Sequence, residues 1–240
     1  MSPDIRKHRG AHPEDKTLFA AEQLRALRTA VSELSWLLSR GYTMKAALKL
    51  VGDHHALTER QRLAVSRAAC SDQSKARRTE TMMPAENING EGLIIDGFNL
   101  IITVEAALSG GLIMICRDGC LRDLSSVHGS YRSVNETNSA IRLIGESIAA
   151  LRPKSVVWML DKPISNSGRL AKRIRDMAAE NGWNWTVQVT FNPDNDIAAS
   201  GKIVVSSDGP LLDRVERWLN FNRYLINARL AALWLIDLSC

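Results

Sequence analysis

The sequence is poor in cysteine and contains no long hydrophobic run. Four cysteines in 240 residues are too few for a disulfide framework, and Cys116 and Cys120 have no second pair at the spacing of zinc ligands. We therefore expect buried thiols in a reducing compartment. No apolar run approaches the ~18 residues of a membrane span, and the charged start of the chain has no apolar stretch typical of a secretory signal. These absences predict a cytoplasmic protein with no membrane partner.

Common active-site motifs are also missing. The sequence contains neither G-x-x-x-x-G-K-[ST] nor G-x-G-x-x-G after a predicted strand, which argues against P-loop and dinucleotide-binding proteins. No G-x-S-x-G motif accompanies His128, so a Ser–His nucleophile system is not indicated.

What is present is an ordinary globular composition with an uneven charge. Apolar residues make up 45% and charged residues 24% of the chain, and this length suits one large or two modest domains. Residues 1–88 hold 15 Lys and Arg against 10 Asp and Glu, whereas residues 89–240 hold 16 against 16. The excess positive charge lies in the first third, which permits a polyanionic partner without requiring one.

The first third of the chain has the pattern of a small α-helical domain. Gly41 is placed to end a first helix, Thr43 to cap a second, and Thr58 with Gln61 to form the capping box of a third. Apolar residues at steps of three and four predict the first helix over residues 17–39: Leu18, Ala21, Leu24, Leu27, Val31, Leu34 and Leu38.

Basic residues gather on and after the third predicted helix. The cluster favours either a surface that binds nucleic acid or a solvated polar face, and the same domain could bind a protein partner or a second copy in a homodimer. Its members are Arg60, Arg62, Arg67, Lys75, Arg77 and Arg78.

Residues 71–91 have few large apolar side chains and many charges, which is typical of a linker. We place the helical domain at residues 1–80, the linker at 81–91 and a second domain at 92–240.

The second domain alternates short β-branched runs with helical stretches. Strands are predicted at 93–95, 156–160, 185–189 and 203–205, and a further strand at 112–116 turns near Gly119 as a hairpin. Helices are predicted at 136–151 and 167–180. Nearly continuous apolar strands separated by helices indicate a parallel sheet covered on both faces. The expected fold is therefore a three-layer, Rossmann-like α/β sandwich that follows the helical domain.

Carboxylates follow the predicted strands. Asp96, Asp161 and Asp208 each come directly or almost directly after an apolar strand, and Asp194 and Asp196 follow the third strand. Aspartate also caps helices and forms turns, but its recurrence at strand ends favours a site, because these ends meet at one edge of a parallel sheet. Clustered carboxylates repel one another unless a cation lies between them, and oxygen-only ligands favour Mg²⁺ or Mn²⁺.

Polar residues near these aspartates are candidates to orient a ligand or hold a phosphate. Asn99 offers an amide close to Asp96, and Arg132 and His128 lie in a polar segment before the helix at 136–151. Ser167 and Arg169 begin the helix after the second strand, where amide groups and a guanidinium can bind an anion.

The segments IIDGFNLI and VVSSDGPLLD resemble the PIN-like nuclease superfamily, particularly its NYN-type branch. Asp96, Asn99 and Asp208 match its pattern, and Asp161 falls where that branch often has another acid. The resemblance implies a Mg²⁺- or Mn²⁺-dependent ribonuclease. It also implies a helix acid, for which Glu136 and Glu146 are both candidates. The chain departs from the pattern after Asp208, where Gly209 and Pro210 follow and Asp213 is the next acid.

Most of the chain, from about residue 15 to 218, also resembles an uncharacterised prokaryotic family of unknown function.

Two other functions are alternatives to the ribonuclease. The first is a catalytically inactive module of the same fold that binds RNA or a nucleotide. The second is a Rossmann-like phosphatase, which needs a second acid two residues after its nucleophilic aspartate, whereas Phe98 occupies that position here.

Overall fold

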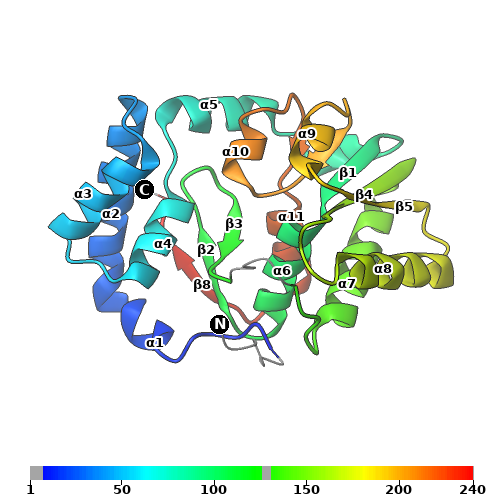
Figure 1. Cartoon of the computed structure of the whole chain (residues 1–240), viewed down its shortest axis with the longest axis horizontal. Coiled ribbons are helices and arrows are strands. Elements are labelled where there is room, and N and C mark those ends of the chain that lie inside the picture. Colours follow the sequence, from blue (N-terminus) through cyan, green and yellow to red (C-terminus); the bar gives the residue numbers. More distant parts are fainter. Residues whose placement is uncertain (1–7, 126–130, 240) are drawn as a thin grey trace.

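The computed structural model of the protein describes residues 8–125 and 131–239. Its centre is a five-stranded, all-parallel sheet in the order β5-β4-β1-β6-β7 (Figure 1). Four of these strands confirm the predicted ones, and β7 is an addition. The strands are β1 Gly92–Asp96, β4 Ser155–Asp161, β5 Trp185–Thr190, β6 Ile203–Val205 and β7 Trp218–Leu219.

Helices cover both faces of this sheet, as the sequence predicts. Ile95 and Trp158 belong to the core on one face, while Ile94 and Met159 belong to the core on the other. The first face carries four helices and the second two short ones. The four are α6 Gly97–Leu108, α7 Thr137–Leu151, α8 Ser167–Asn181 and α11 Phe221–Arg229, and the two are α9 Pro193–Ala198 and α10 Gly209–Leu212.

The strand order indicates at which edge of the sheet a ligand would bind. When the strands of this sheet alone are numbered along the chain, the order is 3-2-1-4-5, so the direction of winding reverses between β1 and β6. In open parallel sheets, ligands bind beyond the carboxyl ends of the strands at such a switch point. Asp96 ends β1 and Asp208 follows β6, so both lie at this edge.

A second, smaller sheet has the order β3-β2-β8. Strands β2 Leu112–Ile115 and β3 Leu121–Asp123 are antiparallel, which confirms the predicted hairpin, and Gly119 has a φ of 77° in its turn. Strand β8 Trp234–Asp237 pairs with β2 in parallel and comes from a C-terminal stretch that the sequence patterns left unassigned. Helix α6 lies between the two sheets (Figure 1) and is buried almost all round, which explains its continuous apolar sequence.

The N-terminal helices are α1 Asp15–Leu18, α2 Ala21–Ser39, α3 Met44–His54 and α4 Glu59–Ala68. The predicted helix over 17–39 is wrong at its start, because Phe19 and Ala20 separate α1 from α2. The predicted stop and caps are confirmed: Gly41 has a φ of 84°, the Thr43 hydroxyl accepts a bond from the Ala46 amide, and Thr58 and Gln61 form a capping box. Side chains of α2 to α4 share one core with β2 and β8, so these helices pack on the small sheet.

Most of the segment with linker composition, residues 71–91, is helical. Helix α5 Asp72–Thr81 begins at a Ser71 cap, and the short 3-10 helix η1 Ala85–Ile88 follows. Helix α5 lies between the N-terminal helices and α10 (Figure 1). It was missed because it has no apolar stripe and is anchored by charged side chains instead.

The anchor is a buried ion network centred on Asp118, in the turn between β2 and β3. The fully buried Asp118 carboxylate accepts bonds from Arg78 at 2.7 Å and from Arg122 at 2.6 and 2.9 Å. Arg78 also donates two bonds of 2.8 Å to Asp213, and Arg122 donates one of 2.6 Å to the Ser207 carbonyl. The network therefore joins α5, the hairpin and the loop after β6.

None of the helices in the described part of the chain is long and apolar enough to cross a membrane.

The Asp118 network should make stability fall in acid. Burial alone would raise the pKa of Asp118, but Arg122 and Arg78 outweigh it and lower the pKa to about 2. The charged form therefore stabilises the fold above pH ~4, and this contribution is lost as the pH falls toward 2. Asp118→Asn should lower the free energy of unfolding by about 3–5 kcal/mol at pH 7, because two buried guanidinium groups lose their partner. Urea unfolding at pH 7 and pH 3 measures both effects.

Asp53→Asn is the matched control, because Asp53 also pairs with two cations, Lys49 and Arg62, but is exposed. It should change stability little. Equal losses in the two variants would contradict the assignment of Asp118 as the anchor.

Candidate active site

Three of the predicted site residues meet at the ends of β1 and β6. The Ser206 hydroxyl donates a bond of 2.8 Å to the Asp96 carboxylate. The amide and hydroxyl of Ser207 donate bonds of 2.9 and 2.8 Å to the side-chain oxygen of Asn99, in the first turn of α6. Both serines are buried. They bring Asp96, Asn99 and the loop before Asp208 together, and the sequence reasoning missed this role.

Asp208 has a structural role beside any functional one. Its carboxylate accepts a bond of 3.0 Å from the Leu211 amide and so caps α10, as aspartates after strands often do. Its own amide donates a bond of 3.0 Å to the Ser206 hydroxyl. The cap fixes the carboxylate at the edge of the sheet, close enough to raise the pKa of Asp96.

Asp161 and Asp194 extend the group toward β4 and β5. Asp161 is the last residue of β4, and Asp194 lies in the first turn of α9 after β5. Burial and the neighbouring Asp194 raise the pKa of Asp161. Burial and Asp208 raise the pKa of Asp194, which Arg214 opposes. We call Asp96, Asp161, Asp194 and Asp208 the aspartate edge, since their negative charges act on one another.

Asp96 has the most strongly shifted pKa of this group. Its pKa is raised to about 7, chiefly by burial of the carboxyl group. The charges of Asp208 and Asp194 also raise the pKa, whereas the hydrogen bond from Ser206 lowers it. A carboxyl group in such a position favours either a proton or a cation beside it.

The donors of the aspartate edge fit Mg²⁺ or Mn²⁺ in kind but do not converge on one point. Within residues 8–125 and 131–239, no three of these carboxylates have oxygens within 4.8 Å of one another. Mg²⁺ usually keeps several waters and binds one or two carboxylates directly. A pair such as Asp96 and Asp208 is therefore sufficient to hold it, with the other carboxylates acting through its waters.

A cleft of about 610 Å³ reaches the aspartate edge from the side of the N-terminal helices. Asn99, Ser207 and Asp208 line it together with Arg67 and Arg78. The helical part of the chain thus lines part of the cleft, which the charge pattern alone did not indicate.

Much of the predicted basic cluster is engaged within the protein. Arg60 pairs with the buried Asp15 and Arg62 with Asp53. Arg77 pairs with Glu216, and Arg78 is buried in the Asp118 network. Arg78 is therefore a structural cation rather than part of a solvated face, because its charge is already neutralised by two aspartates.

The other predicted substrate-binding residues lie apart from these contacts. Arg132 and Arg169 are exposed, Ser167 is buried at the start of α8, and His128 lies outside the described residues. The cap position of α8 is Asn166, whose side chain donates to the Tyr131 carbonyl.

The two candidate helix acids have different surroundings. Glu136 immediately precedes α7 and bonds to His8 at 2.6 Å, whereas Glu146 lies within α7 and bonds to Arg229 of α11 at 2.5 Å. Because α7 leads into β4, its start lies toward the carboxyl edge of the sheet, and position 146 lies about 15 Å further along the helix. The topology therefore favours Glu136.

The predicted burial of Cys116 and Cys120 is confirmed. Cys70, Cys116 and Cys120 are free and buried, while Cys240 lies outside the described residues. Burial raises the pKa of Cys116 to about 11, so the thiol stays protonated.

Comparisons with known proteins place the chain in a family. Residues 85–224 match the profile described as Domain of unknown function (DUF5616), and these residues include the whole five-stranded sheet. The chain belongs to the DUF5616 family. Residues 26–80, which run from within α2 almost to the end of α5, match Protein of unknown function (DUF434).

A relative matches most of the chain in sequence. The Uncharacterized protein MJ0935 of Methanocaldococcus jannaschii is 29% identical over 187 residues, which cover 78% of this chain and 89% of that protein. No solved structure matches the chain. The DUF5616 match contains all four residues of the aspartate edge, and the DUF434 match contains Arg67 and Arg78, which also line the cleft.

The raised pKa of Asp96 predicts how stability changes with pH without metal. The folded state holds a proton that the unfolded state releases above pH ~4, so the free energy of unfolding should decrease as the pH rises from 4 to 7. Asp96→Asn removes this penalty and should gain a few kcal/mol relative to wild type by pH 8. Chemical unfolding in EDTA at pH 5, 6.5 and 8 measures the difference.

Asp176→Asn serves as the control, since Asp176 is an exposed aspartate of α8 paired with Lys172. The free energy of unfolding of this variant should differ from that of wild type by the same amount at all three pH values. An Asp96→Asn curve that also runs parallel to wild type would contradict the raised pKa.

Proposed function

We propose that the protein is a metal-dependent phosphodiesterase of PIN-like type that cleaves RNA at the aspartate edge. The observation that carries this proposal is the arrangement of Asp96, Asn99 and Asp208, which the serines of one loop hold together at the switch point of a parallel sheet. Asp208 of this edge lines a cleft that Arg67 also lines. A cation site next to a cleft with a basic residue suits a phosphodiester substrate.

Each residue has a distinct role in this proposal. Asp96 and Asp208 would hold Mg²⁺ or Mn²⁺, and Asp161 and Asp194 would add negative charge beside it. A bound cation of this kind supplies an activated water and offsets the charge that develops on phosphorus. Asn99, fixed by two bonds from Ser207, orients the loop that carries Asp208. Glu136 is the helix acid that completes the group, and Arg132 and Arg169 contact the phosphate chain from outside.

An exposed aromatic ring supports single-stranded RNA as the substrate. Phe191 follows β5 and is 64% exposed, and the Lys162 ammonium lies 4.4 Å from the centre of its ring. Lys162 is next to Asp161, so the ring and the cation lie beside the aspartate edge. An exposed ring next to a positive charge is the usual platform on which proteins stack a base and hold its phosphate.

The phosphatase alternative has less support. Phe98 occupies the position where that chemistry needs a second acid, and its side chain is buried in the core of the sheet. An inactive RNA-binding module on the same fold is the remaining alternative. Such a module would need the exposed Phe191 ring and the cleft to bind RNA, but it would need no cation.

Loss of one carboxylate from the edge should abolish cleavage. With Mn²⁺ and a labelled single-stranded RNA, wild type should cleave, and Asp96→Asn should be at least about 100-fold slower, because losing a direct ligand costs at least as much as losing an outer-shell partner. Asp176→Asn should keep the wild-type rate. Asp96→Asn cleavage at the wild-type rate would show that the aspartate edge is not the catalyst, and RNA binding without cleavage by any variant would support the inactive module.

Removal of the Phe191 ring should weaken RNA binding without affecting the cation. Phe191→Ala should lose about 1–3 kcal/mol of binding free energy for single-stranded RNA, the usual contribution of one stacked base. Fluorescence anisotropy with wild type and Phe191→Ala in EDTA measures this independently of cleavage. Leu50→Ala is the control, because Leu50 is similarly exposed, at 61%, but lies on α3. Equal affinities of the two variants would exclude the platform.

A further inference from the structure

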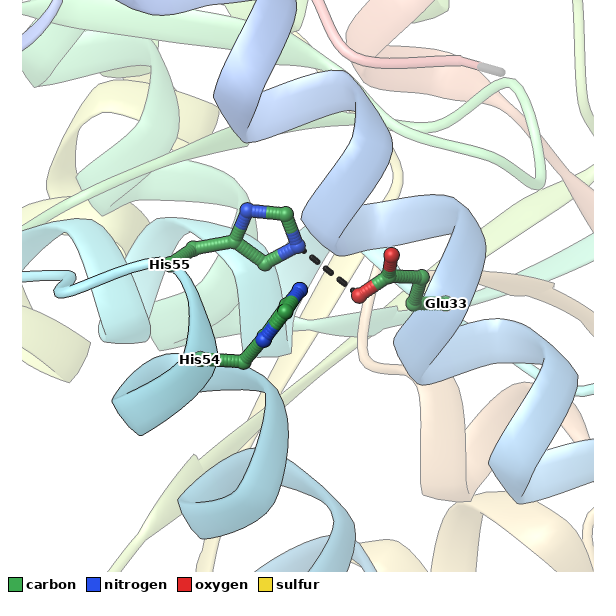
Figure 2. A group of neighbouring side chains, drawn as sticks. All are labelled: Glu33, His54 and His55. Carbon is green, nitrogen blue, oxygen red and sulfur yellow. Dashed lines mark hydrogen bonds and ion pairs between the residues drawn. The ribbon is translucent and has the colours of Figure 1, made fainter.

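A second group of metal-ligating side chains lies on the N-terminal helices, away from the aspartate edge. Glu33 comes from α2, His54 is the last residue of α3, and His55 follows it (Figure 2). One ligand atom from each residue lies within 4.8 Å of the other two, which no other three His, Cys, Asp or Glu residues achieve in the described parts of the chain. Figure 2 shows a ring nitrogen of each histidine and the Glu33 carboxylate directed toward one another.

The end of α3 explains how two consecutive histidines reach the same carboxylate. Side chains of adjacent residues within a helix point about 100° apart, so two such histidines would normally diverge. Here the helix stops at His54, and Ala56 adopts a φ of 49°, which lets the Leu57 amide bond back to the Gly52 carbonyl at 2.9 Å. This turn directs His55 toward α2. Its Nε2 atom lies 2.8 Å from the Glu33 carboxylate. The His54 and His55 rings pack edge to face, with their centres 4.8 Å apart.

Two neighbouring cations are paired with another carboxylate, that of Asp53. The nearby cations Lys49 and Arg62 both bind Asp53, at 2.6 and 2.8 Å. The histidines also lie at the C-terminal end of α3, where the helix dipole favours positive charge. Local electrostatics therefore favours a cation between these three side chains.

We propose that Glu33, His54 and His55 form a binding site for a late first-row divalent cation, chiefly Zn²⁺, that links α2 to α3. Two imidazoles and one carboxylate are a ligand set that zinc uses when three protein ligands leave a fourth position to water. Imidazole ligands also suit copper and nickel but not Mg²⁺. The site is therefore distinct in chemistry from the oxygen-only aspartate edge, and it does not rest on the proposed nuclease function.

The distances allow this coordination with a small movement. Zinc–ligand bonds of about 2.0–2.2 Å place two tetrahedral ligands about 3.4 Å apart. Ligand atoms up to 4.8 Å apart must therefore approach by up to about 1.4 Å, and the His55–Glu33 pair at 2.8 Å must separate by about 0.6 Å. His54 is exposed and turns freely enough to do so, while His55 and Glu33 only exchange their shared hydrogen bond for bonds to the metal.

Zinc binding to the full-length protein tests the site. Isothermal titration of the metal-free protein with ZnCl₂ in excess Mg²⁺ should give one site in wild type, and thermal unfolding should shift upward with zinc. His54→Asn and His55→Asn should each weaken binding by at least about tenfold, because even outer-shell partners contribute that much. His54→Asn is the cleaner variant, since it leaves the bond between His55 and Glu33 in place.

Two controls distinguish this site from others. His12→Asn removes an exposed histidine that lies 3.8 Å from Glu14 without a third ligand, and it should bind zinc like wild type. Asp96→Asn should do the same, so that failure at the aspartate edge and failure here are separable. Wild type that takes up no zinc at 100-fold molar excess, or a His54→Asn variant with unchanged affinity, would overturn the proposal.

Discussion

The buried carboxylate of Asp118 holds together three segments that are far apart in the chain. It lies between the guanidinium groups of Arg78 and Arg122, which in turn bind Asp213 and the Ser207 carbonyl. Each of these charges is costly to bury alone, and the network is tolerated because each has its partner. Helix α5, the β2–β3 hairpin and the loop after β6 are fixed relative to one another by this one arrangement. The wall of the cleft and the position of Ser207 follow from it.

The candidate active site builds on that fixed loop. Ser206 and Ser207 bind Asp96 and Asn99, so the end of β6 is joined to the end of β1 at the point where the sheet reverses its winding. The Asp96 carboxylate is held by the hydroxyl group of the buried Ser206, and the Asp208 carboxylate by the Leu211 amide. Burial of the Asp96 carboxyl group, together with the nearby charges of Asp208 and Asp194, raises its pKa, and a bound cation would favour the charged form.

The two proposed cation sites differ in their ligand atoms and lie in different parts of the chain. The aspartate edge has only oxygen donors and belongs to the DUF5616 match, whereas Glu33, His54 and His55 include two nitrogens and lie in the DUF434 match. The cleft lies between the two parts and takes residues from both. The proposed chemistry therefore requires the helical part to be docked on the small sheet, as the shared core of α2, α4, β2 and β8 ensures.

The sequence by itself determined the features that depend on neighbouring residues. The apolar β-branched runs of β1, β4, β5 and β6, the Gly41 stop and the Thr58 capping box all formed as predicted, because their signals act within a few residues. The placement of Asp96 and Asp208 at one edge also follows from the sequence, once the strands are parallel. The family match agrees with the resemblance to an uncharacterised family, while the PIN-like assignment stays a prediction.

Only the tertiary structure decided what depends on distant partners. Helix α5 has no apolar stripe and is held by bonds such as that of Arg78 to Asp213, 135 positions away. The pairing of β8 with β2, the binding of Asn99 by Ser207 and the approach of Glu33 to two histidines likewise join separate segments. No local pattern marks such contacts, because the same serine, arginine or histidine would serve equally well on a solvated surface.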